Sequence, residues 1–156
     1  MKANASSHTE RRSAPSPQLP RVLVVEDEPH VQALIAHLLQ GLCRVDLAAD
    51  ADAAIAHAEH TTYAAFLVDI TLPSERNGID VLEHLRTQPR HRTAPVVAVT
   101  AHALPGDRER FLGAGFDAYV GKPFKGADLR QTLSQLLRTH RTAATTTHPH
   151  ASTADA

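Results

Sequence analysis

Short apolar segments alternate with amphipathic segments along most of the chain, and this alternation predicts its secondary structure. Five short segments predict strands: residues 21–25, 43–48, 64–69, 95–100 and 117–120. Five longer segments predict helices: residues 29–40, 51–60, 78–88, 105–115 and 126–139. Pro29 is suited to open the first helix, and the Asp50 side chain is suited to cap the second. The first helix has apolar residues at helical spacing: Val31, Leu34, Ile35, Leu38 and Leu39.

Strands that alternate with helices favour a parallel sheet, because each helix carries the chain back across one face before the next strand begins. We therefore expect an α/β fold: a doubly wound, five-stranded parallel sheet in the order 2-1-3-4-5 with five helices, of the flavodoxin-like type. This domain should span residues 21–140. Residues 1–20 and 141–156 are rich in small and polar residues, so we predict disordered tails there.

The composition is that of an ordinary globular protein. Hydrophobic residues make up 42% of the chain and the net charge is −1, so no general attraction to nucleic acid or to an acidic membrane is expected. No apolar stretch approaches the roughly 20 residues that cross a bilayer. The start of the chain lacks the apolar centre of a secretory signal, and the single cysteine, Cys43, excludes an intramolecular disulfide. A cytoplasmic location is therefore expected.

Acidic residues follow two strands that should be neighbours in this sheet. Glu26 and Asp27 follow the first strand, and Asp69 ends the third, so the three carboxylates should share one crevice. Two carboxylates about 4 Å apart repel by roughly 4 kcal/mol at an effective dielectric near 20. Such a group needs bound cations or protons, and its oxygen ligands suit Mg²⁺. The backbone carbonyl of Thr71 is a candidate further ligand.

Two more candidate residues lie at the ends of the fourth and fifth strands. Thr100 ends the fourth strand, and Lys122, one of only three lysines in the chain, follows the fifth. An ammonium group and a hydroxyl both suit phosphate oxygens. Around a metal-bound Asp69 they indicate a phosphoryl-transfer site, in which the carboxylate itself can be the nucleophile.

At this point the chain resembles a known family. The segments VLVVEDEP, FLVDITLP, NGIDVLEHLR, PVVAVTA and YVGKPF are similar to those of the receiver domain of two-component response regulators, of the single-domain chemotaxis-regulator-like type. They stand in family order over nearly all of the predicted domain. The loop that follows Asp69 is one residue longer than in the commonest members, and the first acidic position is glutamate.

The resemblance implies a role for each candidate residue. Asp69 would be the phosphoacceptor, and Asp27 would bind Mg²⁺ directly. Glu26 would act on the metal mostly through water, and Thr71 would add its backbone carbonyl. The same resemblance implies three further roles: Lys122 contacts the phosphoryl group, Thr100 is the switch hydroxyl, and Tyr119 is the aromatic whose rotamer reports phosphorylation.

The resemblance also implies the partners. The phosphoryl donor would be a histidine kinase or a histidine phosphotransfer protein. The chain would be a signalling phosphoacceptor that catalyses only its own phosphorylation and dephosphorylation. No output domain is visible after Thr139, so we expect a downstream protein target or onward phosphotransfer, without direct DNA binding or membrane binding. The sequence leaves open a monomer or a homodimer, and a stand-alone protein or a piece of a hybrid kinase.

Three alternatives are weaker. A phosphohydrolase of the haloacid dehalogenase type also uses an aspartate nucleophile, but it needs a second aspartate where this chain has Thr71. A flavin-binding module of the same architecture predicts a phosphate-binding loop of Ser and Thr where this chain has the three acids of residues 26–28. A zinc site is not favoured, because no further ligand joins the histidine pairs at 57 and 60 or at 148 and 150 with zinc spacing.

Overall fold

The computed structural model describes residues 18–101 and 104–145, and they form the expected α/β fold. The five parallel strands are β1 (Arg21–Val25), β2 (Arg44–Ala48), β3 (Ala65–Val68), β4 (Val96–Thr100) and β5 (Ala118–Gly121). The five helices are α1 (Pro29–Leu38), α2 (Ala51–His60), α3 (Gly78–Thr87), α4 (Asp107–Ala114) and α5 (Gly126–Thr145). The strand order is β2-β1-β3-β4-β5, which confirms the predicted topology.

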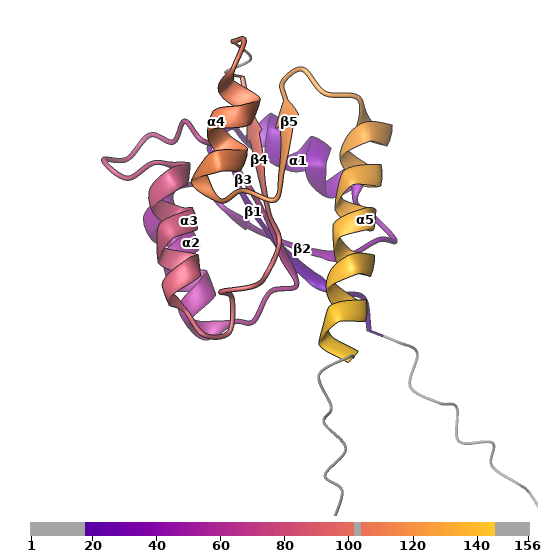
Figure 1. The fold of residues 1–156 in the computed structure, drawn as a ribbon. Coiled ribbons are helices and arrows are strands. Elements are labelled where there is room, and N and C mark those ends of the chain that lie inside the picture. The colour runs from indigo at the N-terminus through magenta and orange to yellow at the C-terminus, as the bar shows by residue number, and fades with distance from the viewer. Residues whose placement is uncertain (1–17, 102–103, 146–156) are drawn as a thin grey trace, which may run out of the picture.

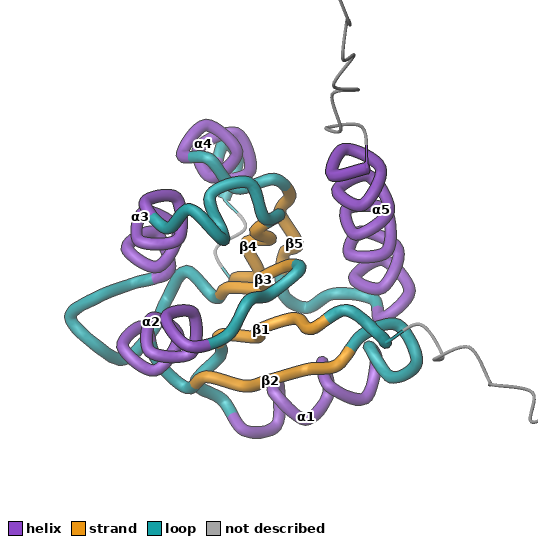
Figure 2. Tube along the Cα trace, turned by 90° about the horizontal axis from the view of Figure 1, so that it is seen from below, coloured by secondary structure: helices purple, strands orange, loops and turns teal. Residues whose placement is uncertain are grey.

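Helices cover both faces of the sheet (Figure 1, Figure 2). One face packs against α2, α3 and α4, and its core includes Leu23 and Phe66 of the central strands. The other face packs against α1 and α5, and its core includes Val24 and Leu67. Successive strand residues thus point into opposite layers, which explains why the central strands are apolar throughout. Among the described residues, no helix has both the length and the apolar character required to cross a membrane.

The helix ends follow local sequence signals. Pro29 occupies the first turn of α1, and Asp50 caps α2 by accepting a hydrogen bond of 2.7 Å from the Ala53 amide, as predicted. Asn77 caps α3, a feature that the sequence analysis did not identify. Helix α5 runs to Thr145 instead of ending at Thr139. The rest of the predicted tails, residues 1–17 and 146–156, lies outside the described residues.

A histidine lies in the core at the amino ends of the strands. His91 is fully buried and packs edge-on against Phe66, with ring centroids 5.1 Å apart. Its Nε2 accepts a hydrogen bond of 3.1 Å from the backbone amide of Tyr63, so this nitrogen carries no proton. Burial and the nearby Arg90 lower the pKa of His91 below its usual value. The sequence patterns predicted no role for this residue.

Candidate functional site

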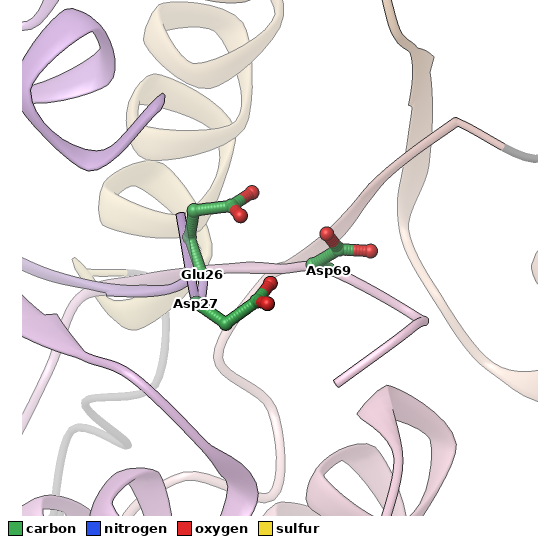
Figure 3. Close-up of side chains that lie close together, drawn as sticks. All are labelled: Glu26, Asp27 and Asp69. Atoms are coloured by element: carbon green, nitrogen blue, oxygen red, sulfur yellow. The ribbon is translucent and has the colours of Figure 1, made fainter. Parts of the chain in front are cut away.

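Three carboxylates meet at the carboxyl edge of the sheet. Strands β1 and β3 are adjacent, and Val25 is in register with Val68, so the residues that follow both strands emerge side by side. Carboxylate oxygens of Glu26, Asp27 and Asp69 lie within 4.8 Å of one another. Figure 3 shows the three side chains extending into a common space. The predicted convergence of these acids is therefore present.

Lys122 completes this cluster from the end of β5. Its Nζ lies 2.6 Å from Glu26 Oε2 and 2.8 Å from Asp69 Oδ2. The side chains of Lys122, Glu26 and Asp69 are only 16%, 2% and 8% exposed, so water screens these ion pairs poorly. The ammonium group therefore bridges the two buried carboxylates.

The pKa shifts reflect burial and this pairing. Burial raises the pKa of Glu26, although the hydrogen bonds from Lys122 and from the Glu28 amide act in the opposite direction. For Lys122, burial acts to lower the pKa, but the hydrogen bonds to Asp69 and Glu26 outweigh it and hold the pKa above its usual value. Lys122 is thus charged at neutral pH.

The net charge of the cluster suits a divalent cation. When all groups are ionised, three carboxylates oppose one ammonium group, which leaves two negative charges uncompensated. The donors are hard oxygen atoms, and Asp27 is exposed, so a hydrated ion can reach it. The residues present therefore fit Mg²⁺ in both charge and ligand type.

Backbone hydrogen bonds fix the two acidic segments. The amide of Asp69 donates to the carbonyl of Val25 at 2.9 Å, and the amide of Thr71 donates to Asp69 Oδ1, also at 2.9 Å. With Lys122 bound to the other oxygen, the Asp69 carboxylate is held from both sides. The amide of Glu28 donates to Glu26 Oε1 at 3.0 Å, so the Glu26 carboxylate is held in the same way.

The structure places the other predicted residues around this cluster. Thr100 is fully buried at the end of β4, and its carbonyl accepts a hydrogen bond of 2.8 Å from the amide of Lys122. Thr71 follows Asp69 by two residues and is exposed. Tyr119 is half-buried in β5 and stacks on Phe111 of α4, with ring centroids 5.9 Å apart and planes 12° apart. Burial raises the pKa of Tyr119, and Asp107 adds to this effect. The roles of these three residues stay predictions.

Helix α4 buries fewer of its residues than α3 does. Phe111 is the one buried residue of α4. The helix is flanked by two glycines with positive φ, Gly106 and Gly115. A cleft of about 350 Å³ separates it from the segment that follows Asp69. This cleft is lined by residues of both segments: Ile70, Thr71, Leu72, Asn77, Ile79, Leu104, Asp107, Arg110 and Phe111.

Two residues that the sequence patterns did not indicate support the site. Gly78, the first residue of α3, lies against the backbone of Asp69, and its amide donates to the carbonyl of Ile70 at 3.0 Å. Gln32 of α1 donates from Nε2 to the backbone carbonyl of Glu26 at 2.5 Å. The position of Gly78 directly after the cap residue Asn77 is only a weak indication of its close contact with Asp69. Nothing in the sequence distinguishes Gln32 from a solvated residue.

Known proteins are similar to this chain in sequence and in fold. The model of the response regulator receiver domain family matches residues 22–134. The chain is 35% identical over 113 residues to the signal transduction histidine-protein kinase BarA of Shigella flexneri. This match covers 72% of the chain and 12% of the kinase. The chain is also 36% identical over 118 residues to the response regulator Rre1 of Synechocystis. This match covers 74% of the chain and 51% of that regulator. The chain thus corresponds to about half of one relative and a small part of the other.

A solved structure agrees in fold as well. The receiver domain of the sensor histidine kinase PA1611 from Pseudomonas aeruginosa is 40% identical, with a TM-score of 0.70 over 77% of this chain and 98% of that domain. That domain has a magnesium ion coordinated in its active site cleft. The sequence match, the sheet order and the acidic cluster agree with one another, and the chain belongs to the response regulator receiver domain family of two-component systems.

Proposed function

We propose that this chain is a phosphorylation-controlled signalling domain in which Asp69 accepts a phosphoryl group from a phosphohistidine. The observation that carries this proposal is the convergence of the Asp69 carboxylate with Glu26, Asp27 and Lys122 in one cluster. The donor is a histidine kinase or a histidine phosphotransfer protein. A cytoplasmic location remains a prediction.

We assign the metal ligands to the acidic cluster. Glu26, Asp27, Asp69 and the backbone carbonyl of Thr71 would hold Mg²⁺, and the magnesium in the related PA1611 domain supports this assignment. When bound, the ion offsets negative charge on the phosphoryl oxygens. Lys122 is placed to offset the remainder, because it already contacts Asp69 Oδ2.

In the proposed transfer step, the Asp69 carboxylate is the nucleophile that attacks the phosphohistidine donor. An Asp69 oxygen forms a bond to phosphorus as the bond from phosphorus to the imidazole nitrogen breaks, and the imidazole keeps the electron pair. The product is an acyl phosphate on Asp69. The Thr71 amide, bound to Oδ1, orients the carboxylate and leaves Oδ2 toward Lys122. A haloacid dehalogenase mechanism is not favoured, because Thr71 offers no carboxyl group as general acid.

The signal would reach the surface through α4 and β5. In this proposal, Thr100 moves toward the phosphoryl group, and Tyr119 turns inward from its stack on Phe111. Such a shift of α4 would disrupt little core packing, because Phe111 is its one buried residue. The altered surface would bind a downstream protein or pass the phosphoryl group on. The sequence leaves open a monomer or a phosphorylation-driven homodimer. The absence of direct DNA binding remains a prediction.

Intact-mass spectrometry tests this function directly. We expect incubation with Mg²⁺ and acetyl phosphate to add one phosphoryl group that hydroxylamine removes, because acyl phosphates react with this nucleophile. Asp69→Asn should abolish the addition, and a chelator should prevent it. A hydroxylamine-stable phosphate, or unchanged labelling of Asp69→Asn, would contradict the proposal. Multiple turnovers of a phosphate monoester would favour the phosphohydrolase instead.

A further inference from the structure

We propose that Gln32 is a positioning residue for the metal site, because it fixes the peptide that joins Glu26 to Asp27. Gln32 lies on the second turn of α1, outside the acidic segment itself. Its Nε2 donates a hydrogen bond of 2.5 Å to the backbone carbonyl of Glu26. This inference rests on the proposed metal ligands but not on the phosphoryl transfer.

The direction of this hydrogen bond is determined by chemistry. A backbone carbonyl can only accept, so the amide nitrogen of Gln32, and not its oxygen, faces Glu26. The carbonyl of Glu26 and the amide of Asp27 belong to the same planar peptide. A constraint on this carbonyl is therefore also a constraint on the direction in which the Asp27 side chain leaves the backbone.

Asp27 depends on this constraint more than Glu26 or Asp69 does. Lys122 and backbone amides hold the carboxylates of Glu26 and Asp69. In the described part of the chain, no such partner holds the Asp27 carboxylate, which is exposed. Its position is set by the backbone, and Gln32 ties that backbone to α1.

Other hydrogen bonds hold the two ends of the same segment. The amide of Glu26 donates to the carbonyl of Ala48 at 2.9 Å, and the amide of Gln32 donates to the carbonyl of Glu28 at 2.9 Å as α1 begins. Gln32 therefore contacts the segment twice, through its backbone and its side chain. Removing the side-chain amide leaves the helix start intact and frees the peptide between Glu26 and Asp27.

Gln32→Met tests this inference, because methionine keeps the length of the side chain and removes the donor. Isothermal titration of the full chain with Mg²⁺ should show an affinity about tenfold lower than wild type, in the range found for residues that orient metal ligands. The matched control is Gln131→Met on the exposed face of α5, which should bind Mg²⁺ like wild type. Thermal unfolding in a chelator should be similar for all three proteins.

A second readout separates positioning from a merely structural role. In phosphorylation by acetyl phosphate, Gln32→Met should raise the Mg²⁺ concentration that gives half the maximal rate and leave the rate at saturating Mg²⁺ near wild type. Unchanged Mg²⁺ affinity in Gln32→Met, or absence of Mg²⁺ binding to wild type, would overturn the inference. Mg²⁺ binding without phosphorylation of Asp69 would instead overturn the proposed function and leave this inference standing.

Discussion

Gly78 lies so close to Asp69 that a β-carbon at position 78 would overlap the backbone carbonyl oxygen of Asp69. Because both atoms would be fixed to backbone, a side-chain rotation cannot relieve the overlap. Gly78→Ala should therefore displace the Asp69 backbone and lower the free energy of unfolding by about 1–3 kcal/mol, the usual cost of overpacking. Denaturant unfolding measures the loss, and phosphorylation by acetyl phosphate should slow in parallel.

Gly113 supplies the control for this substitution. It lies inside α4, and a β-carbon there would meet no atom within 4 Å. Gly113→Ala should raise the free energy of unfolding by about 0.5–1 kcal/mol, because alanine favours the helix. Equal stability of Gly78→Ala and wild type would show that the backbone around Asp69 adapts more freely than we infer.

Removal of the Lys122 ammonium group should destabilise the fold when no metal is present. Lys122→Met leaves the carboxylates of Glu26 and Asp69 buried without their cation. Breaking a buried ion pair in this way costs about 3 kcal/mol. Denaturant unfolding in a chelator measures this loss, and added Mg²⁺ should recover part of it. Lys125→Met, at an exposed position, is the control and should unfold like wild type.

Protonation of His91 should destabilise the protein in mild acid. Burial lowers the pKa of His91 in the folded state, so the unfolded chain binds a proton more readily below a pH of about 6.5, its ordinary pKa. The contribution of neutral His91 to the free energy of unfolding is complete above that pH and falls as the pH decreases. Protonation would also remove the acceptor for the Tyr63 amide. His91→Gln should flatten the fall in unfolding free energy between about pH 6.5 and 5.

The slope of the unfolding free energy against pH decides the role of His91. If His91→Gln showed the same slope as wild type over this range, groups other than His91 would account for the acid sensitivity.

Arg86 should anchor the carboxyl end of α4 to α3. Its guanidinium group donates to the carbonyls of Ala94 and Gly115 at 2.7 and 3.1 Å, and it pairs with Asp117 at 3.0 Å. Arg86→Met should lower the free energy of unfolding by about 1–2 kcal/mol. Amide hydrogen exchange around residues 115–117 should become faster. The control is Arg108→Met, at an exposed position of α4. It should change neither the free energy of unfolding nor the rate of amide exchange.

The fold and the acidic cluster could be predicted because they follow from regular patterns. Strands that alternate with helices determine a parallel sheet, and a parallel sheet gathers the ends of its strands at one edge. Glu26, Asp27 and Asp69 therefore converge as a consequence of topology. The same reasoning placed Lys122 at this edge, and the structure adds its direct contacts to Glu26 and Asp69.

The remaining features depend on contacts that periodicity does not encode. Leu34 fits the apolar spacing of α1, yet it is 48% exposed because neighbouring elements cover only part of that face. His91 stands in a polar turn with nothing to indicate burial. Helix α5 continues to Thr145 through alanines, which favour a helix even where composition suggests a tail. Gln32 and Gly78 act on backbone atoms of other segments, and such pairs appear only in three dimensions.

The central claim is that Asp69 carries the phosphoryl group, and locating the acyl phosphate tests it most directly. Borohydride reduces an aspartyl phosphate to homoserine, which tandem mass spectrometry of peptides can assign to one position. After treatment with Mg²⁺ and acetyl phosphate, we predict homoserine at position 69 and unmodified Glu26 and Asp27. Reduction products at position 26 or 27, or none at position 69 in a protein that has gained a phosphoryl group, would contradict the account.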